Sequence, residues 1–213
     1  MFHNKRNFIF ILLAGIFITN AITAELIGGK LIQIYGFTLS LGILPWPIVF
    51  VTTDLINEYF GQKGVRRLTF LTAGLICYAF ILLFFGMKIP AVDFSPVKDE
   101  QFTAVFGQSM WIIVGSIIAF IVSQLLDVYL FSQFKKQTGE KHIWLRATGS
   151  TVISQLIDSF IVLGIAFYIP GKITLEQYFT MGLTGYIAKL CIAVGMTPFV
   201  YLGHYWIGKQ LRE

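Results

Sequence analysis

Charged residues are scarce in this chain of 213 residues. Lysine, arginine, aspartate and glutamate together make up 13% of it, about half of the roughly 25% that is typical of a globular domain. Hydrophobic residues make up 56%, the mean hydropathy is +0.74, and long tracts carry almost no charge. A soluble domain could not bury so much apolar surface, so the composition excludes that class and predicts an integral membrane protein.

Cysteine and histidine are also rare. Cys77 and Cys191 each lie inside an apolar run, without the His or Cys neighbours that a metal or redox site needs. His3, His142 and His204 lie at predicted membrane edges or in loops, and neither an HExxH nor a GxSxG motif occurs. No nucleotide-binding motif is present either. We therefore expect no enzyme activity, no cofactor and no metal site.

The formal net charge of +5 allows two interpretations. A basic balance is found in nucleic-acid-binding proteins, but basic residues in short loops also anchor membrane spans on the cytoplasmic side. The second interpretation fits a chain this apolar. The expected partner is therefore the lipid bilayer and not a nucleic acid.

Six segments have the roughly 20 apolar residues that a membrane-spanning helix needs. The connections between them are mostly short, which predicts a single transmembrane domain over residues 1–213, an all-α bundle of six helices. The longest connection, 89–108, is expected to carry a short amphipathic helix at the membrane surface. The predicted spans are about 7–28, 39–57, 68–88, 109–132, 147–169 and 183–207.

The first segment also has features of a secretory signal peptide: a basic start, an apolar core and small residues at Ala21 and Ala24. Its apolar run is long for a signal core, and Asn20 interrupts it where a cleavage site would be expected. We therefore expect the segment to be retained as the first span.

Lysine and arginine alternate between the two sides of this predicted bundle. Eleven lie in the N-terminus, the 58–67 loop, the 133–146 loop and the C-terminus, and four lie on the opposite side. This bias predicts that both termini are cytoplasmic. The eleven are Lys5, Arg6, Lys63, Arg66, Arg67, Lys135, Lys136, Lys141, Arg146, Lys209 and Arg212; the four are Lys30, Lys88, Lys98 and Lys172.

Two prolines, Pro45 and Pro47, fall inside the second predicted span. Proline removes a helix donor and clashes with the preceding turn, so we expect this helix to be kinked or broken there. Broken helices at membrane depth often line a binding cavity, as in transporters. A purely structural kink remains the alternative.

A short repeat links the fourth and fifth spans. "SQLLDVYLF" (123–131) and "SQLIDSFIV" (154–162) share Ser-Gln-Leu-aliphatic-Asp, 31 residues apart. Because the two helices run in opposite directions, a true duplication would be of the inverted type found in transporters. A chance match of five residues is the alternative.

Polar residues share one face on several spans, as the helical spacing of Asp54, Asn57 and Glu58 illustrates. An ionisable group in the hydrocarbon costs roughly 2.5–3.5 kcal/mol, so these residues either hold helices together by hydrogen bonds or line a wet cavity. Four carboxylates, of Glu25, Asp54, Asp127 and Asp158, face one intramembrane base, Lys189. The predicted site residues are Asn20, Asp54, Asn57, Glu58, Gln124, Asp127, Gln155, Asp158 and Lys189.

An intramembrane aspartyl protease would need a pair of carboxylates, and Asp127 with Asp158 is the candidate. Antiparallel helices place them roughly 9 Å apart along the axis. The spacing argues against a protease.

The stretch "FVTTDLINEYFGQKGVRR" (50–67) resembles the hallmark of the queuosine precursor transporter family, six-helix proteins of the bacterial inner membrane that are also labelled a vitamin uptake family. "SQLLDVYLF", "RATGSTVISQLIDSFI" and "GYIAKLCIAVGMTPFVYLG" are similar to that family's later spans, in the same order. The resemblance implies a multi-pass inner-membrane protein that takes up 7-cyano-7-deazaguanine, 7-aminomethyl-7-deazaguanine or queuine, which feed the queuosine modification of tRNA. The positions that match the family pattern are Asn20, Asp54, Gln124, Asp127, Asp158, Lys189 and Pro198, whereas Glu25, Asn57 and Glu58 vary in type within the family.

A 7-deazaguanine base suits these residues chemically. Its ring N–H and exocyclic amine are adjacent donors that one carboxylate can accept together, and its carbonyl oxygen can accept from Lys189, Gln124 or Gln155. Its flat face can stack on aromatic rings. Four aromatic residues near the outer ends of spans either provide such a surface or form an ordinary interfacial belt: Trp46, Trp111, Tyr178 and Tyr186.

The sequence therefore predicts a small transporter that imports a queuosine precursor by alternating access. The excess of intramembrane carboxylates suits coupling to a proton, whereas facilitated diffusion needs no coupling ion. The main alternative is the substrate-binding component of an energy-coupling-factor importer, which needs partner ATPases. A structural subunit of a membrane complex is a third interpretation, and a homodimer stays open.

Overall fold

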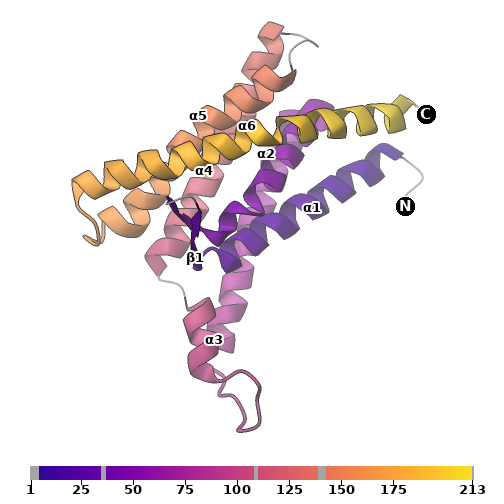
Figure 1. The fold of residues 1–213 in the computed structure, drawn as a ribbon. Coiled ribbons are helices and arrows are strands. Elements are labelled where there is room, and N and C mark those ends of the chain that lie inside the picture. Colours follow the sequence, from indigo (N-terminus) through magenta and orange to yellow (C-terminus); the bar gives the residue numbers. More distant parts are fainter. Residues whose placement is uncertain (1–4, 35–36, 108–109, 139–142, 213) are drawn as a thin grey trace.

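The computed structural model describes residues 5–34, 37–107, 110–138 and 143–212. It is built almost entirely from helices, with one short hairpin of strands between the first two (Figure 1). In chain order the elements are α1 Lys5–Ile27, β1 Leu31–Ile34, β2 Phe37–Ser40, a 3-10 turn Leu41–Ile43, α2 Trp46–Gly86, α3 Asp99–Phe106, α4 Met110–Thr138, α5 Ile143–Leu163 with a π-helical end Gly164–Tyr168, and α6 Leu175–Arg212.

Five helical segments among the described residues are long and apolar enough to cross a membrane. Those of α1, α4, α5 and α6 correspond to predicted spans 7–28, 109–132, 147–169 and 183–207, although residue 109 lies outside the described part of the chain. The prediction of an all-α membrane protein is therefore confirmed.

The fifth segment, α2, covers the two remaining predicted spans, 39–57 and 68–88. The predicted connection between them, 58–67, is helical except at Gly61, where φ 75° and ψ 173° form a kink between two helices. This backbone region is accessible essentially to glycine alone, so Gly61 produces the bend that divides α2 into two arms. The count of six crossings requires each arm to cross separately, and it stays a prediction.

Pro45 and Pro47 lie at the beginning of α2 rather than within a helix. Pro45 is the N-cap, Pro47 occupies the first turn, and the amide of Ile48 donates to the carbonyl of Pro45 at 3.1 Å. The first turn of a helix has unpaired donors in any case, so proline is tolerated there. The prolines thus begin α2, and the bend that the structure contains lies at Gly61.

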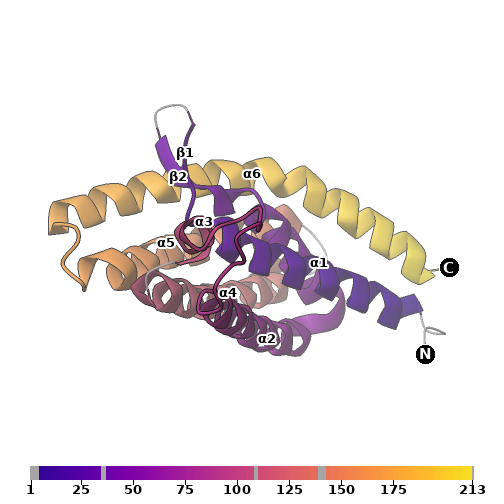
Figure 2. The ribbon, with the colours of Figure 1, turned by 90° about the horizontal axis from the view of Figure 1, so that it is seen from below.

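The hairpin β1–β2 was not predicted. Its strands pair antiparallel, with Leu31 opposite Ser40, and Figure 2 shows it projecting on the side of α6, which β2 contacts. The predicted short helix in 89–108 is confirmed as α3. Phe102 of α3 lies against Gly86 at the end of α2, so α3 runs beside that end of the long helix (Figure 1).

An apolar core joins α1, α2 and α4. Phe17 and Phe120 are 0% and 2% exposed, with ring centroids 6.2 Å apart, and Val49 and Ile56 pack in the same cluster. Each fully buried side chain of this size contributes about 1.5–3 kcal/mol. Because α2 is fixed by this core, the polar residues along its first arm are held at defined positions opposite α4 and α5.

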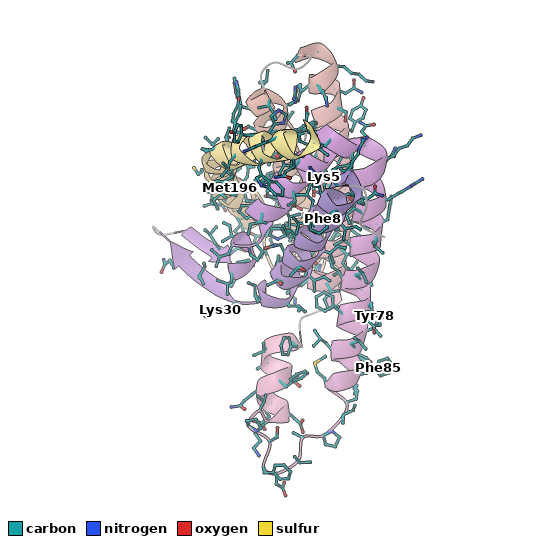
Figure 3. The ribbon with its side chains drawn as sticks, turned by 90° about the vertical axis from the view of Figure 1, so that its right-hand side faces the viewer. Lys5, Phe8, Lys30, Tyr78, Phe85 and Met196 are labelled. Carbon is teal, nitrogen blue, oxygen red and sulfur yellow. The ribbon has the colours of Figure 1, made fainter. Side chains whose placement is uncertain are left out.

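Large apolar side chains also point outward. Tyr78 and Phe85 on the second arm of α2 are 57% and 61% exposed and point away from the bundle (Figure 3). Much of α6 likewise presents apolar side chains to its surroundings, among them Phe199 and Leu202. Such surfaces are expected where a helix contacts lipid.

Candidate substrate-binding site

Helices α4 and α5 are tied together by a reciprocal exchange between the two repeat motifs. Ser123 of the first motif donates to Asp158 of the second, and Ser154 of the second donates to Asp127 of the first, each at 3.2 Å. The two motifs therefore occupy equivalent positions on antiparallel helices. This local symmetry is what an inverted duplication would produce, although the duplication itself stays a prediction.

A pocket lies at one end of this exchange, and we call it the Asp158 pocket. It holds about 240 Å³ of empty space, its open mouth included. Residues of α2, α4, α5 and α6 line it: Trp46, Phe50, Ser123, Gln124, Gln155, Asp158 and Lys189.

The charged part of this pocket is an ion pair. Lys189 Nζ lies 2.6 Å from Asp158 Oδ2, and the two side chains are 29% and 17% exposed. Asp158 Oδ1 also accepts from Ser123. A charge-assisted hydrogen bond of this kind holds both groups in place, while their partial exposure leaves them within reach of a ligand.

The apolar part of the pocket is an aromatic wall. Trp46 and Phe50 lie one turn apart on α2 and stack with centroids 6.0 Å apart and planes inclined by 17°. Phe120 supports Trp46 from behind, at 5.7 Å between centroids. Flat aromatic surface facing a carboxylate, an ammonium group and two amides can bind a planar molecule that carries hydrogen-bond donors and acceptors.

Asp127 is held by hydroxyl groups. Thr151 and Ser154 each donate to Asp127 Oδ1 at 3.2 Å, and the residue is 2% exposed. Its neighbour Gln124 donates to the hydroxyl of Thr53 on α2. Asp127 is thus more buried than Asp158, and its hydrogen bonds link α4 to α5.

Asp54 lies near Asp127 but is less well satisfied. It is 4% exposed, and its Oδ1 has no hydrogen-bond partner. It lines a second pocket, which we call the Asp54 pocket, of about 290 Å³ including its mouth. The residues that line it are Phe50, Val51, Asp54, Ala147, Thr148, Thr151, Ala193, Met196, Thr197 and Val200.

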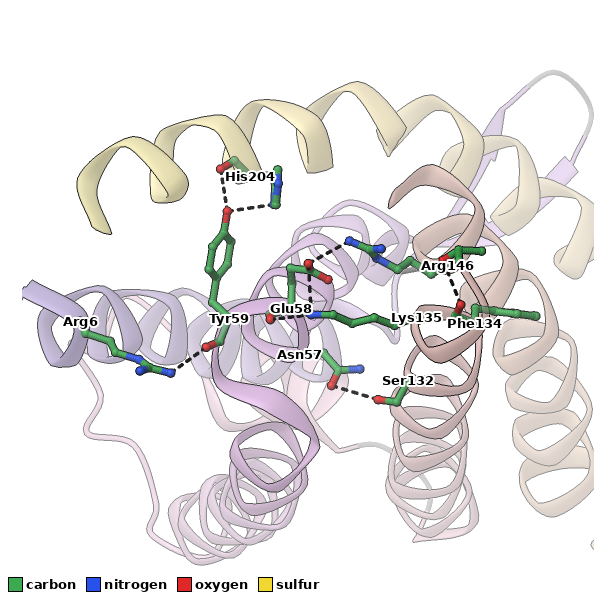
Figure 4. Close-up of polar contacts among 10 residues, drawn as sticks. Arg6, Asn57, Glu58, Tyr59, Ser132, Phe134, Lys135, Arg146 and His204 are labelled. Atoms are coloured by element: carbon green, nitrogen blue, oxygen red, sulfur yellow. Dashed lines mark hydrogen bonds and ion pairs between the residues drawn. The ribbon is translucent and has the colours of Figure 1, made fainter. Parts of the chain in front are cut away.

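Glu58 is engaged by two cations at the far end of the polar face. Arg146 Nη2 and Lys135 Nζ lie 2.8 Å and 3.2 Å from its Oε1 (Figure 4). Arg146 is 1% exposed and its guanidinium lies 5.8 Å from the ring centroid of Phe131. This cluster joins α2, α4 and α5 where the first arm of α2 ends.

Asn57 and Asn20 make structural contacts. Asn57 donates to the carbonyl of Val128 at 3.2 Å and accepts from Ser132 at 3.5 Å, so it ties α2 to α4 (Figure 4). Asn20 donates to the carbonyl of Ile16 within its own helix. The structure does not bring Asn20 together with the residues that line either pocket.

Arg146 was missed as a site residue, because the Lys/Arg count placed it in the predicted loop 133–146. That placement is wrong, since α5 begins at Ile143 and Arg146 is buried in its first turn. A sequence signal did exist: Arg146, Ser150, Ser154 and Asp158 are each four residues apart and so share one helix face. Phe50 and Thr151 were also missed, because each looks like an ordinary core residue when taken singly.

Glu25 is the remaining acidic residue of the polar interior. Glu25, 8% exposed, lies against Ser116 and near Asp158, so α1 also contributes to the polar interior. Among the described residues, no group of three or more His, Cys, Asp or Glu side chains is arranged to hold a metal ion.

Comparison with known proteins gives one family match. The model described as "Putative vitamin uptake transporter" matches residues 40–203, which is well over half of the chain and includes every residue that lines the two pockets. Asn20 and Glu25 lie outside the matched range.

Individual relatives agree with this match. The chain is 28% identical over 186 residues to a "Probable queuosine precursor transporter" of Bacillus subtilis, covering 86% of this chain and 80% of the relative. It is 29% identical over 164 residues to a protein of the same description from Haemophilus influenzae, with 75% and 66% covered. A "Queuosine precursor transporter" of Escherichia coli is 26% identical over 170 residues, with 76% and 71% covered. No solved structure matches the chain.

Proposed function

The chain belongs to the family described as "Putative vitamin uptake transporter", and from this premise we propose that it imports a queuosine precursor. Membership makes it a transport protein rather than an enzyme, and its helices make it a multi-pass protein of a bacterial membrane. The proposed substrates are 7-cyano-7-deazaguanine, 7-aminomethyl-7-deazaguanine and queuine. They share one bicyclic ring system with the same donors and acceptors.

The single observation that carries the proposal is the partly exposed pair of Asp158 and Lys189 beside the stacked rings of Trp46 and Phe50. The carboxylate of Asp158 can accept the ring N–H and the exocyclic amine together, and Lys189 can donate to the carbonyl oxygen. The aromatic wall can cover the flat face of the ring.

Selectivity follows from the same groups. A base that draws Lys189 to its carbonyl oxygen but lacks the paired donors would leave Asp158 Oδ2 without its present partner in a partly buried pocket. A site built to satisfy hydrogen bonds rejects such analogues strongly, because its own polar groups are then left unpaired. We therefore expect adenine and hypoxanthine to compete poorly, since neither presents the same edge.

Alternating access is the proposed mechanism, with the site opening to either side of the membrane in turn. The carboxylates of Asp54 and Asp127, which lie deeper than the Asp158 pocket, are groups that could carry a proton with the base. Facilitated diffusion is the alternative, and it predicts uptake that does not respond to the proton gradient.

The test is rescue of tRNA modification. The protein is expressed in bacteria that neither make the precursor nor possess their own importer, each of the three bases is supplied at nanomolar concentration, and queuosine in tRNA is assayed by mobility shift. Queuosine should appear with at least one base and disappear when Asp158→Asn replaces the wild-type protein. Adding a protonophore separates coupled uptake from facilitated diffusion.

Two results would count against the proposal. If membrane-inserted protein rescues with none of the bases, the chain does not import a queuosine precursor on its own. If rescue also requires a separately expressed ATPase, the chain is instead the substrate-binding component of an energy-coupling-factor importer.

A further inference from the structure

The Asp54 pocket has the features of a binding position in its own right. It contains a carboxylate that is 4% exposed and whose Oδ1 lacks a hydrogen-bond partner, together with the hydroxyl-bearing residues Thr148, Thr151 and Thr197. The hydroxyls of Thr148 and Thr197 contact each other at 3.0 Å across the boundary of α5 and α6. A buried acceptor without a donor is costly, so the pocket is poised to take a ligand that brings one.

The two pockets follow each other along the same helices. On α2 the lining passes from Trp46 to Asp54, on α5 from Asp158 to Thr151, and on α6 from Lys189 to Met196. Each step is seven or eight residues, or roughly 10–12 Å of helix. The pockets therefore lie one after the other along α2, α5 and α6.

Phe50 stands between these positions. It is the one residue that lines both pockets among those described, and its ring stacks on Trp46 on the side of the Asp158 pocket. Phe50 is therefore a wall that the two pockets share.

The charges around Asp54 limit what can bind there. Asp127 and Glu58 are the acidic groups that act on it, and Arg146 is the basic group, but Arg146 is already bonded to Glu58 at 2.8 Å. An anion would be repelled by the carboxylates. A neutral or cationic ligand with N–H donors would satisfy Asp54 Oδ1 and could exchange hydrogen bonds with the threonine hydroxyls.

We propose that the Asp54 pocket is a second binding position for the same donor-bearing base, which reaches it from the Asp158 pocket past the ring of Phe50. The inference rests on the proposed function, because it takes the substrate class from there. It adds a second stop on the transport path, so that the base exchanges one carboxylate for another as it moves inward.

Protection of engineered thiols tests both pockets separately. Cys77 and Cys191 are first replaced by serine, and single cysteines are then introduced as Ser123→Cys in the Asp158 pocket, Ala193→Cys in the Asp54 pocket and Ala104→Cys on α3 as an exposed control. The purified full-length protein in lipid nanodiscs is treated with a maleimide at increasing concentrations of each of the three bases. Each variant is repeated with Asp54→Asn added.

The expected result is that the base protects the thiols at 123 and 193 but not the one at 104. With Asp54→Asn, protection at 193 should require at least tenfold more base, while protection at 123 stays unchanged. Protection at 123 without protection at 193 overturns the second position and leaves the proposed function standing. Protection at 193 that does not depend on Asp54 overturns it as well. Protection at neither position, together with failed rescue of queuosine, overturns both proposals.

Discussion

Asp158 and Lys189 are the residues on which substrate binding is expected to depend most directly. Asp158→Asn keeps the shape but cannot accept two N–H groups, and Lys189→Met removes the donor for the carbonyl oxygen. A hydrogen bond to a charged group contributes about 1.5–3 kcal/mol, so each change should lower base uptake by at least about tenfold. Initial rates of radiolabelled base uptake provide the measurement.

Asp93→Asn is the matched control, since Asp93 is exposed in the connection before α3 and should transport normally. Uptake by Asp158→Asn at the rate of this control, with equal protein in the membrane, would contradict the assigned role of the carboxylate.

Arg146 is expected to matter for stability rather than for binding. Arg146→Met leaves Glu58 buried with only Lys135 to pair with it, and removing one partner of a buried ion pair costs about 3–5 kcal/mol. The thermal unfolding midpoint in detergent should fall markedly, whereas Arg67→Met, at an exposed position on α2, should leave it unchanged.

The double change Glu58→Gln with Arg146→Met tests the cause. Because it removes both charges, it should recover much of the lost stability. Equal loss in the single and double variants would mean that the packing of Arg146 on Phe131, and not its charge, stabilises the bundle.

At the scale of single helices, the bend of α2 depends on one residue. Gly61→Ala and Gly74→Ala are a matched pair, because a Cβ added at either position meets nothing within 4 Å. They differ in backbone, since Gly61 has φ +75° while Gly74 lies in regular helix. Gly61→Ala should cost about 1–3 kcal/mol, and Gly74→Ala should be neutral or gain about 0.5–1 kcal/mol.

Thermal unfolding of the two variants in the same detergent measures this difference. If Gly61→Ala unfolds at the temperature of the wild type, then the left-handed backbone at residue 61 is not required, and α2 could continue as a straight helix.

The sequence predicted where the helices lie better than it predicted the connections between them. Hydropathy locates α1, α4, α5 and α6, because runs of apolar residues reflect lipid contact directly. It makes the connection at 58–67 too long, because the structure confines the break between the two helices to Gly61. It also misses the hairpin, since the alternating pattern of Leu31, Gln33 and their neighbours is short and lies beside a long apolar span.

Helical periodicity in the sequence predicts the polar residues of the candidate site but not its aromatic ones. Asp158, Lys189, Gln124 and Gln155 were found because polar residues on an apolar helix stand out, and the structure gathers them in one pocket. Phe50 could not be found in this way, since one phenylalanine among 21 carries no distinctive signal. Its importance comes from its position between two pockets, which depends on the packing of three helices.

At the scale of the whole molecule, the arrangement of the helices determines which side of the membrane each end faces. Figure 1 shows the C-terminal part of α6 toward the upper part of the view and α3 at the bottom. The alternation of lysine and arginine predicts that both termini are cytoplasmic. With cytoplasmic termini and six crossings, we expect the bend at Gly61 to return α2 across the membrane, so that its two arms make the second and third crossings.

Accessibility of single cysteines in intact cells tests this topology. In a variant without Cys77 and Cys191, single cysteines are introduced as Lys63→Cys, Lys98→Cys and Lys209→Cys. The cysteine at 98 should react with an impermeant maleimide in intact cells. Those at 63 and 209 should react only after the membrane is permeabilised. Labelling of residue 63 from outside would mean that α2 crosses once and that five crossings, not six, build the protein. The C-terminus would then lie on the opposite side of the membrane from the N-terminus, and the side to which each pocket opens would have to be reassigned.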